Sequence, residues 1–121
     1  VWIGLDYQDR AALYRRIDLR VENMLSNGLL DEIRALLALG VSPKTTAMQA
    51  IGYKEFFGYL SGACSLDEAA ALCKQRSRNY AKRQLTWFRR NPDVHWLRMT
   101  GTEDFSEVLS AARQNIPFSA L

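Results

Sequence analysis

The start of the chain combines a strand pattern with a helical pattern. The run VWIGL at 1–5 is short, continuous and apolar, which is typical of a buried strand. A helix of about 18 residues follows, because the next apolar residues recur every three or four positions. These residues are Leu13, Ile17, Val21, Met24 and Leu25. Asp6 and Asp9 are candidate N-caps of this helix, and Asn27-Gly28 ends it, since glycine accepts the left-handed conformation common at that position.

Later segments continue the helical pattern and add one more strand. The stretch SLDE at 65–68 is a capping box, a specific local signal for a helix start. Thr102 is the candidate cap of the last helix, which Pro117 follows. The expected helices lie at about 30–39, 53–60, 66–90 and 103–114, and the second strand lies at 94–99. This order predicts a mainly α fold with two short strands, and the absence of repeats and linkers predicts a single segment over 1–121.

Composition limits the class of protein. Of the 121 residues, 48% are hydrophobic, which is enough for the core of one domain. No apolar run approaches the ~18 residues that a membrane span requires, and the first residues lack the basic and apolar regions of a signal peptide. We therefore expect a cytoplasmic protein without a membrane segment. Cys64, Cys73 and His95 are not clustered, so their spacing predicts free thiols and no metal site.

Basic residues are concentrated in one segment. The net charge is only +3, and residues 1–60 carry seven acids and seven bases, yet residues 74–90 carry seven bases and no acid. At 100° per residue, bases and aromatic rings alternate along one stripe of the predicted long helix. This stripe contains Arg76, Tyr80, Arg83, Trp87 and Arg90. Two interpretations stay open: a solvated surface helix, or a nucleic-acid surface that neutralises phosphates and stacks on unpaired bases.

Arg20 lies beside the apolar stripe of the first predicted helix. A guanidinium group in such a place is costly unless it is paired. One interpretation is an internal carboxylate partner, or a side chain that extends to the edge of the core. The other is a ligand anion such as a phosphate, whose oxygens match the fork of the guanidinium group.

Three segments together resemble the carboxy-terminal part of the tRNA dimethylallyltransferases, the isopentenyl-tRNA transferase family. They are RIDLRVENMLSNGLLDEIRALLALG (16–40), QAIGYKEFFGYLSG (49–62) and RSRNYAKRQLTWFRRN (76–91). The resemblance covers roughly residues 3–97. Its most specific parts are QAIGYKE and AKRQLTWFR, which are long and correctly spaced.

The resemblance implies an activity, partners and a fold. Enzymes of this family transfer a dimethylallyl group from dimethylallyl pyrophosphate to N6 of adenine 37 in tRNA, and Mg2+ assists the pyrophosphate. Their fold is a P-loop-like α/β core with a helical insertion that grips the tRNA anticodon stem-loop. The target base leaves the stack and enters a channel, as chemistry on a base requires. This chain would then be the carboxy-terminal part of that core.

The resemblance also assigns site residues by position. One tRNA-facing segment would be Gln49, Ala50, Ile51, Gly52, Tyr53 and Lys54. The other would be Lys82, Arg83, Gln84, Leu85, Thr86, Trp87, Phe88 and Arg89. Arg20 matches an arginine that would contact the pyrophosphate, and is the one candidate catalytic residue.

The sequence departs from the family pattern in its phosphate site. The family has a glycine-rich loop that ends in Gly-Lys-Ser/Thr and, further on, an Asp that acts as general base, but no Gly-Lys-Ser/Thr occurs here and the helical insertion is missing. We therefore expect a carboxy-terminal portion that supplies tRNA contacts, is inactive alone and does not bind the Mg2+ of the complete enzyme. The alternative is a non-enzymatic helical module that binds RNA or a protein partner.

Overall fold

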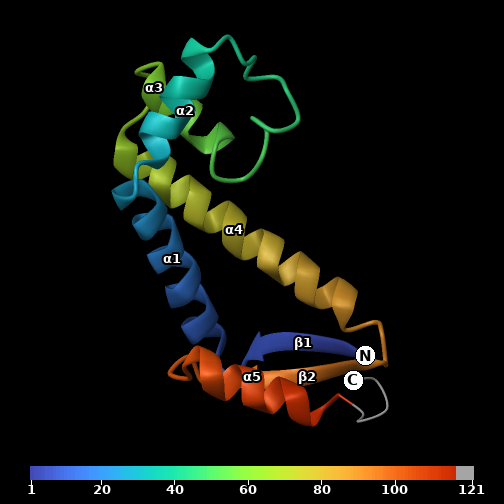
Figure 1. Cartoon of the computed structure of the whole chain (residues 1–121). Helices are drawn as coiled ribbons and strands as arrows, with labels where there is room; N and C mark the ends of the chain where they lie inside the picture. The colour runs from blue at the N-terminus through green and yellow to red at the C-terminus, as the bar shows by residue number, and fades with distance from the viewer. Residues whose placement is uncertain (117–121) are drawn as a thin grey trace. The chain divides into compact units, whose positions relative to one another are not determined.

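The computed structural model describes residues 1–116 and confirms a mainly helical protein with two strands (Figure 1). The elements are β1 (Trp2–Tyr7), α1 (Arg10–Ser26), α2 (Leu29–Ala38), the 3-10 helix η1 (Lys54–Phe56), α3 (Phe57–Leu60), α4 (Leu66–Phe88), β2 (Val94–Met99) and α5 (Phe105–Gln114). Pro117, expected to follow the last helix, lies outside the described residues. Within the described part, no helix is both long and apolar enough to cross a lipid bilayer.

Local capping interactions explain where several helices begin. The Asp9 carboxylate accepts the Ala11 backbone N–H at 3.0 Å before α1. The predicted capping box before α4 is present: the Glu68 N–H donates to the Ser65 hydroxyl at 3.1 Å, and the Ser65 N–H donates to the Glu68 carboxylate at 2.7 Å. Hydrogen bonds from Ser65 to the Glu68 carboxylate, from its backbone N–H first and then from its side chain, hold the pKa of Glu68 below its usual value. Gly28 ends the first helical segment with φ 94, as the sequence predicted.

Two predicted caps were wrong. Asp6 is no cap, because β1 continues through Tyr7 and the Asp6 side chain turns to arginines of its own unit. The last helix begins after Asp104 rather than Thr102. The Asp104 carboxylate and the Glu107 side chain form a reciprocal capping box, and a carboxylate accepts backbone N–H groups better than a hydroxyl does.

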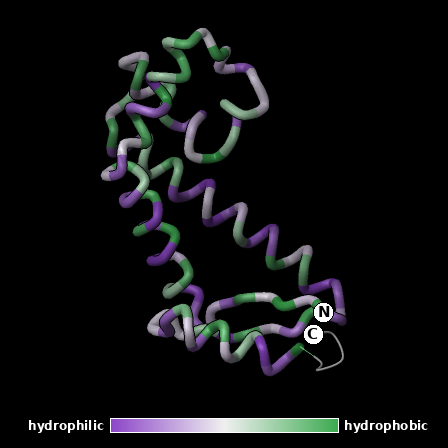
Figure 2. The backbone as a smooth tube through the Cα atoms, in the orientation of Figure 1, coloured by the Kyte–Doolittle hydropathy of each residue, from purple (hydrophilic) through white to green (hydrophobic). Residues whose placement is uncertain are grey.

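Contacts divide the chain into two compact units. Unit 1 contains residues 1–16 and the residues from 81 on, and unit 2 contains Ile17–Tyr80. The core of unit 2 consists of apolar side chains from α1, α2, η1, α4 and the loop after α2. Its largest fully buried members are Phe56, Ile33, Met48, Val21 and Cys73. Figure 2 shows hydrophobic and hydrophilic positions alternating along α1 and α4, the pattern from which these helices were predicted.

Unit 1 is built on a two-stranded parallel sheet. β1 and β2 pair in a register that places Gly4 beside Trp96 and Asp6 beside Arg98. Parallel strands require a crossover connection, and the helices between the two strands provide it. Gly4 has a packing role, because a Cβ atom there would lie 2.7 Å from the Trp96 ring. Trp96 is half-buried, and His95 is exposed.

Candidate nucleic-acid interface

The end of α4 within unit 1 presents a mixture of rings and bases. Leu85 and Phe88 are half-buried, whereas the Trp87 side chain is 62% exposed. The Trp87 and Phe88 rings meet edge to face with centroids 4.9 Å apart, so Phe88 supports the exposed indole. The Lys82 ammonium group lies 5.7 Å from the centre of the Tyr14 ring. Leu85 and Phe88 thus lie on the inner side of the helix end, and Trp87 lies on its outer side.

Most bases of the acid-free segment 74–90 have carboxylate partners from other parts of the chain. The ion pairs are Lys74–Glu22 at 2.7 Å, Arg76–Glu55 at 3.0 Å, Arg89–Asp6 at 2.7 Å, and Arg78–Asp18. Carboxylates of the same fold therefore balance the positive charge of four of the seven bases in this segment. Among residues 1–116, Lys82 and Arg90 have no carboxylate partner, and both are exposed.

Asp6 gathers two of the arginines of unit 1. Its side chain is buried, and its Oδ2 atom accepts from Arg89 Nη2 at 2.7 Å and from Arg98 Nη1 at 3.1 Å. The other oxygen, Oδ1, accepts the backbone N–H of Tyr7 at 2.8 Å. Arg89 thus has a structural partner besides the tRNA contact predicted for it, and that contact stays a prediction. Sequence reasoning missed Arg98, which lies on β2 and outside every recognised motif.

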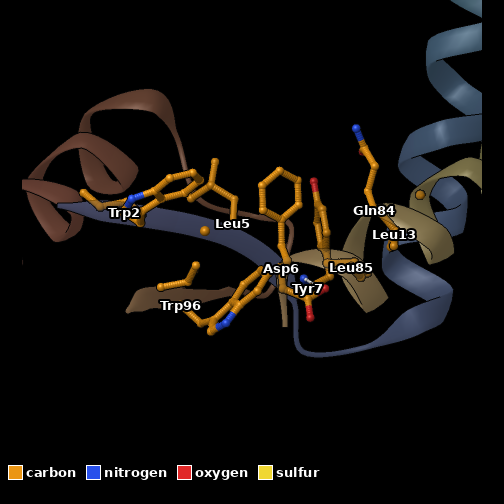
Figure 3. A pocket seen from close by; sticks show the side chains of 13 residues that line it. Trp2, Leu5, Asp6, Tyr7, Leu13, Gln84, Leu85 and Trp96 are labelled. Carbon is orange, nitrogen blue, oxygen red and sulfur yellow. Dashed lines mark hydrogen bonds between the residues drawn. The ribbon is translucent and has the colours of Figure 1, made fainter. Parts of the chain in front are cut away.

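An open pocket of about 290 Å³ lies within unit 1 beside this group. Figure 3 shows its lining, which comes from β1, β2, α1 and the end of α4. Rings and aliphatic side chains dominate, including Trp2, Leu13, Leu85 and Trp96. The polar side chains in the lining are those of Asp6, Tyr7 and Gln84. Such a pocket suits a flat or apolar group with one polar edge.

The segment from Gln49 to Lys54 lies in unit 2 and divides into an exposed and an anchored part. Gln49, Ala50 and Ile51 are exposed, and the Gln49 amide donates to the Pro43 carbonyl at 2.8 Å. Gly52 is buried with φ 104, a conformation that favours glycine. The surface available to a partner is therefore the exposed first half, while Lys54 is half-buried in η1.

Glu55 and Glu32 anchor the second half of this segment. The fully buried Glu55 carboxylate accepts the Gly52 N–H at 2.8 Å and pairs with Arg76. The Tyr53 hydroxyl donates to the Glu32 carboxylate, and this hydrogen bond raises the pKa of Tyr53. The family-like sequence GYKE is thus explained in part by internal contacts that fix the loop.

The structure corrects the expectation that Arg20 lies at the edge of the core. Its side chain is exposed on α1, and no carboxylate among residues 1–116 pairs with it. Val21, the next residue, takes the fully buried position. The helix is rotated so that Val21 and not Arg20 faces the core, which leaves the guanidinium group available to an anion.

The described residues do not fit a metal ion. No group of three or more His, Cys, Asp or Glu side chains within residues 1–116 is arranged to hold one. The two cysteines are free, with Cys73 buried and Cys64 half-buried.

The fold and surface define a mainly helical protein with a small parallel sheet and an exposed basic and aromatic helix end. Residues 1–91 match the family described as IPP transferase, and the chain belongs to this family. The match includes Arg20 and both predicted tRNA-facing segments, but it ends before β2.

Individual relatives agree with the family match. The chain is 52% identical over 94 residues to tRNA dimethylallyltransferase 1 of Citrifermentans bemidjiense, covering 78% of this chain and 31% of that protein. It is 43% identical to the tRNA dimethylallyltransferase of Pelotomaculum thermopropionicum, covering 88% and 33%. The crystal structure of the tRNA isopentenylpyrophosphate transferase of Bacillus halodurans matches with a TM-score of 0.84 and 44% identity, over 94% of this chain and 37% of that one. The chain thus spans about a third of the length of these relatives.

Proposed function

We propose that this chain acts as part of a tRNA dimethylallyltransferase and contributes contacts to the tRNA anticodon stem-loop. The reaction would transfer a dimethylallyl group from dimethylallyl pyrophosphate to N6 of adenine 37. The names of the relatives support the activity, since each is a tRNA dimethylallyltransferase or a tRNA isopentenylpyrophosphate transferase.

One observation at the end of α4 carries the proposed role. The exposed Trp87 lies in sequence between Lys82 and Arg90, and neither of these two basic side chains has a carboxylate partner in the described part of the chain. Lysine and arginine side chains neutralise backbone phosphates, and an exposed aromatic ring stacks on an unpaired nucleobase. The exposed residues Gln49, Ala50 and Ile51 offer a second, uncharged contact surface in unit 2.

The residues of this chain bind and orient rather than carry out the proton transfer. Arg20 is exposed and without a carboxylate partner, which supports the proposed contact with the pyrophosphate. Mg2+ in the complete enzyme would neutralise pyrophosphate charge. We expect the 121-residue polypeptide alone to transfer no dimethylallyl group to tRNA, because its sequence contains no Gly-Lys-Ser/Thr phosphate loop.

The test is a salt titration of the affinity of the 121-residue polypeptide for an anticodon stem-loop RNA. In Lys82→Gln and Arg90→Gln, the slope of log K against log salt should become less negative by about 0.7–0.9 per lost phosphate contact. In Trp87→Ala, affinity should fall by about 1–3 kcal/mol with an unchanged slope, because stacking releases no counterions.

Arg34→Gln is the matched control, since Arg34 is an exposed base that pairs with Asp31 on the helix α2. Melting curves of every variant separate lost binding from lost folding. If neither Lys82→Gln nor Arg90→Gln differs from Arg34→Gln, and Trp87→Ala binds normally, the helix end is only a solvated surface and the proposed role is wrong.

A further inference from the structure

The Asp6 carboxylate pairs with two arginines, and neither arginine directs all of its N–H donors at it. Arg89 and Arg98 each place one terminal nitrogen on the same carboxylate oxygen, at 2.7 and 3.1 Å. A guanidinium group has five N–H donors, and its usual match to a carboxylate is bidentate. Neither arginine adopts the bidentate arrangement, so most of their donors are not directed at Asp6.

The remaining donors are accessible to solvent. The Asp6 side chain is 1% exposed, whereas the side chains of Arg89 and Arg98 are 44% and 53% exposed. Two positive groups thus share one buried negative group, which leaves a local charge of +1 at the surface. No second carboxylate in residues 1–116 pairs with either arginine.

The placement of this group also favours a ligand. Asp6 and Arg98 are register partners, each next to the last residue of its parallel strand. In parallel sheets, ligands bind beyond the carboxyl ends of the strands. A buried carboxylate that only required charge balance would be satisfied by one arginine in bidentate geometry, so the second arginine has no need within the fold alone.

We propose that Arg89 and Arg98, oriented by Asp6, form a binding site for a phosphate group. Arg98 lies outside the residues that match the family, and nothing in that match assigns it a role. The guanidinium groups contact the phosphate oxygens, and Asp6 is a positioning residue that fixes both side chains. This inference rests on the proposed function and extends it, because the phosphate belongs either to the RNA backbone or to a pyrophosphate.

Two arms of one experiment separate these sources, both with the 121-residue polypeptide. The first measures the affinity for anticodon stem-loop RNA over a range of salt concentrations. The second measures the affinity for inorganic pyrophosphate by calorimetry. Arg98→Gln keeps the Arg89–Asp6 pair and therefore the fold. It should weaken binding about tenfold in the arm that contains the true ligand. A backbone phosphate would also make the RNA salt slope less negative by about 0.7–0.9.

Asp6→Asn distinguishes a positioned site from a simple excess of charge. The substitution raises the net charge by one, so charge alone would tighten binding of any polyanion. We expect weaker binding instead, because both guanidinium groups lose their anchor. Tighter binding by Asp6→Asn would contradict the positioning role. If this variant fails to fold, Arg98→Gln decides the phosphate site by itself.

The control Arg34→Gln removes an exposed, paired arginine from unit 2. Equal behaviour of Arg98→Gln and Arg34→Gln in both arms would overturn the site. The proposed function fails separately, through Lys82, Trp87 and Arg90, which are not part of this group. A normal effect of Lys82→Gln beside an ineffective Arg98→Gln would reject the phosphate site and leave the proposed function intact.

Discussion

The two units of the chain differ in how many apolar residues they bury. Besides the charged Glu55, unit 2 encloses seven buried apolar residues. They are Val21, Leu29, Ile33, Met48, Phe56, Ala69 and Cys73. In the described part of unit 1, the one buried residue is the charged Asp6, while large apolar side chains such as Trp2, Leu5, Trp87 and Phe105 are exposed.

The charges of α4 follow the same division. In unit 2, each base of this helix, Lys74, Arg76 and Arg78, has a carboxylate partner. In unit 1, Lys82 lies over a tyrosine ring instead and has no carboxylate partner among the described residues. One continuous helix therefore packs against a buried apolar core in unit 2, whereas its end in unit 1 carries exposed side chains. Ion pairs occur in both units, since Arg89 and Arg98 of unit 1 pair with Asp6.

The largest expected effect tests whether unit 2 contains the stabilising core. Phe56 is fully buried, so Phe56→Ala should lower the free energy of unfolding by about 3–5 kcal/mol. Phe105 is the matched control on unit 1: it is 80% exposed, and Phe105→Ala should change stability by less than about 0.5 kcal/mol. Urea denaturation measures both. Similar losses in the two variants would show that the units do not differ in this way.

An intermediate effect is expected from an ion pair inside unit 2. Arg76→Gln leaves the fully buried Glu55 carboxylate with only the Gly52 N–H as partner, which should cost about 1–3 kcal/mol. Arg34→Gln removes a partner of the exposed Asp31 and should cost at most about 0.5 kcal/mol. The measurement is the free energy of unfolding at neutral pH. An Arg76→Gln variant as stable as Arg34→Gln would mean that the pairing of bases in unit 2 contributes little.

Much of the fold follows from local patterns in the sequence. The strand at 94–99 and the capping box at 65–68 were predicted with the bounds that the structure shows, because the residue patterns that predict them are local. The rotation of α1 could not be fixed this way. Val21 lies within the apolar stripe and Arg20 at its border, 100° away on the helix, and only packing against the other helices decides whether a border position is buried.

The carboxylate partners of the basic segment 74–90 could not be predicted from the sequence for a different reason. Arg76 pairs with an acid 21 positions away, Arg78 with one 60 positions away, and Arg89 with one 83 positions away. A local count of charges therefore shows only bases. It overestimated the free positive charge, and it had no means of joining Arg98 to Asp6.

The smallest expected effect concerns the thiol in the core of unit 2. Burial raises the pKa of Cys73 above its usual value near 9.0, and the negative charge of Glu55 raises it further. At about one pH unit or more below 9 the thiol is protonated in both the folded and the unfolded chain. Above pH 9 the unfolded chain releases this proton first, so the folded state is disfavoured as the pH rises, by at most about 1.4 kcal/mol per pH unit. The free energy of unfolding of the wild type should therefore fall more steeply between pH 8.5 and about 10 than that of Cys73→Ala. Cys64→Ala removes a thiol that is only half-buried, and it is the control for the loss of a thiol as such. Tyr53, whose pKa is also raised, is present in all three proteins, so its contribution cancels in the comparison. Parallel curves for the wild type and Cys73→Ala would show that the thiol is not enclosed by the core, and would weaken the contrast between a packed unit 2 and an open unit 1.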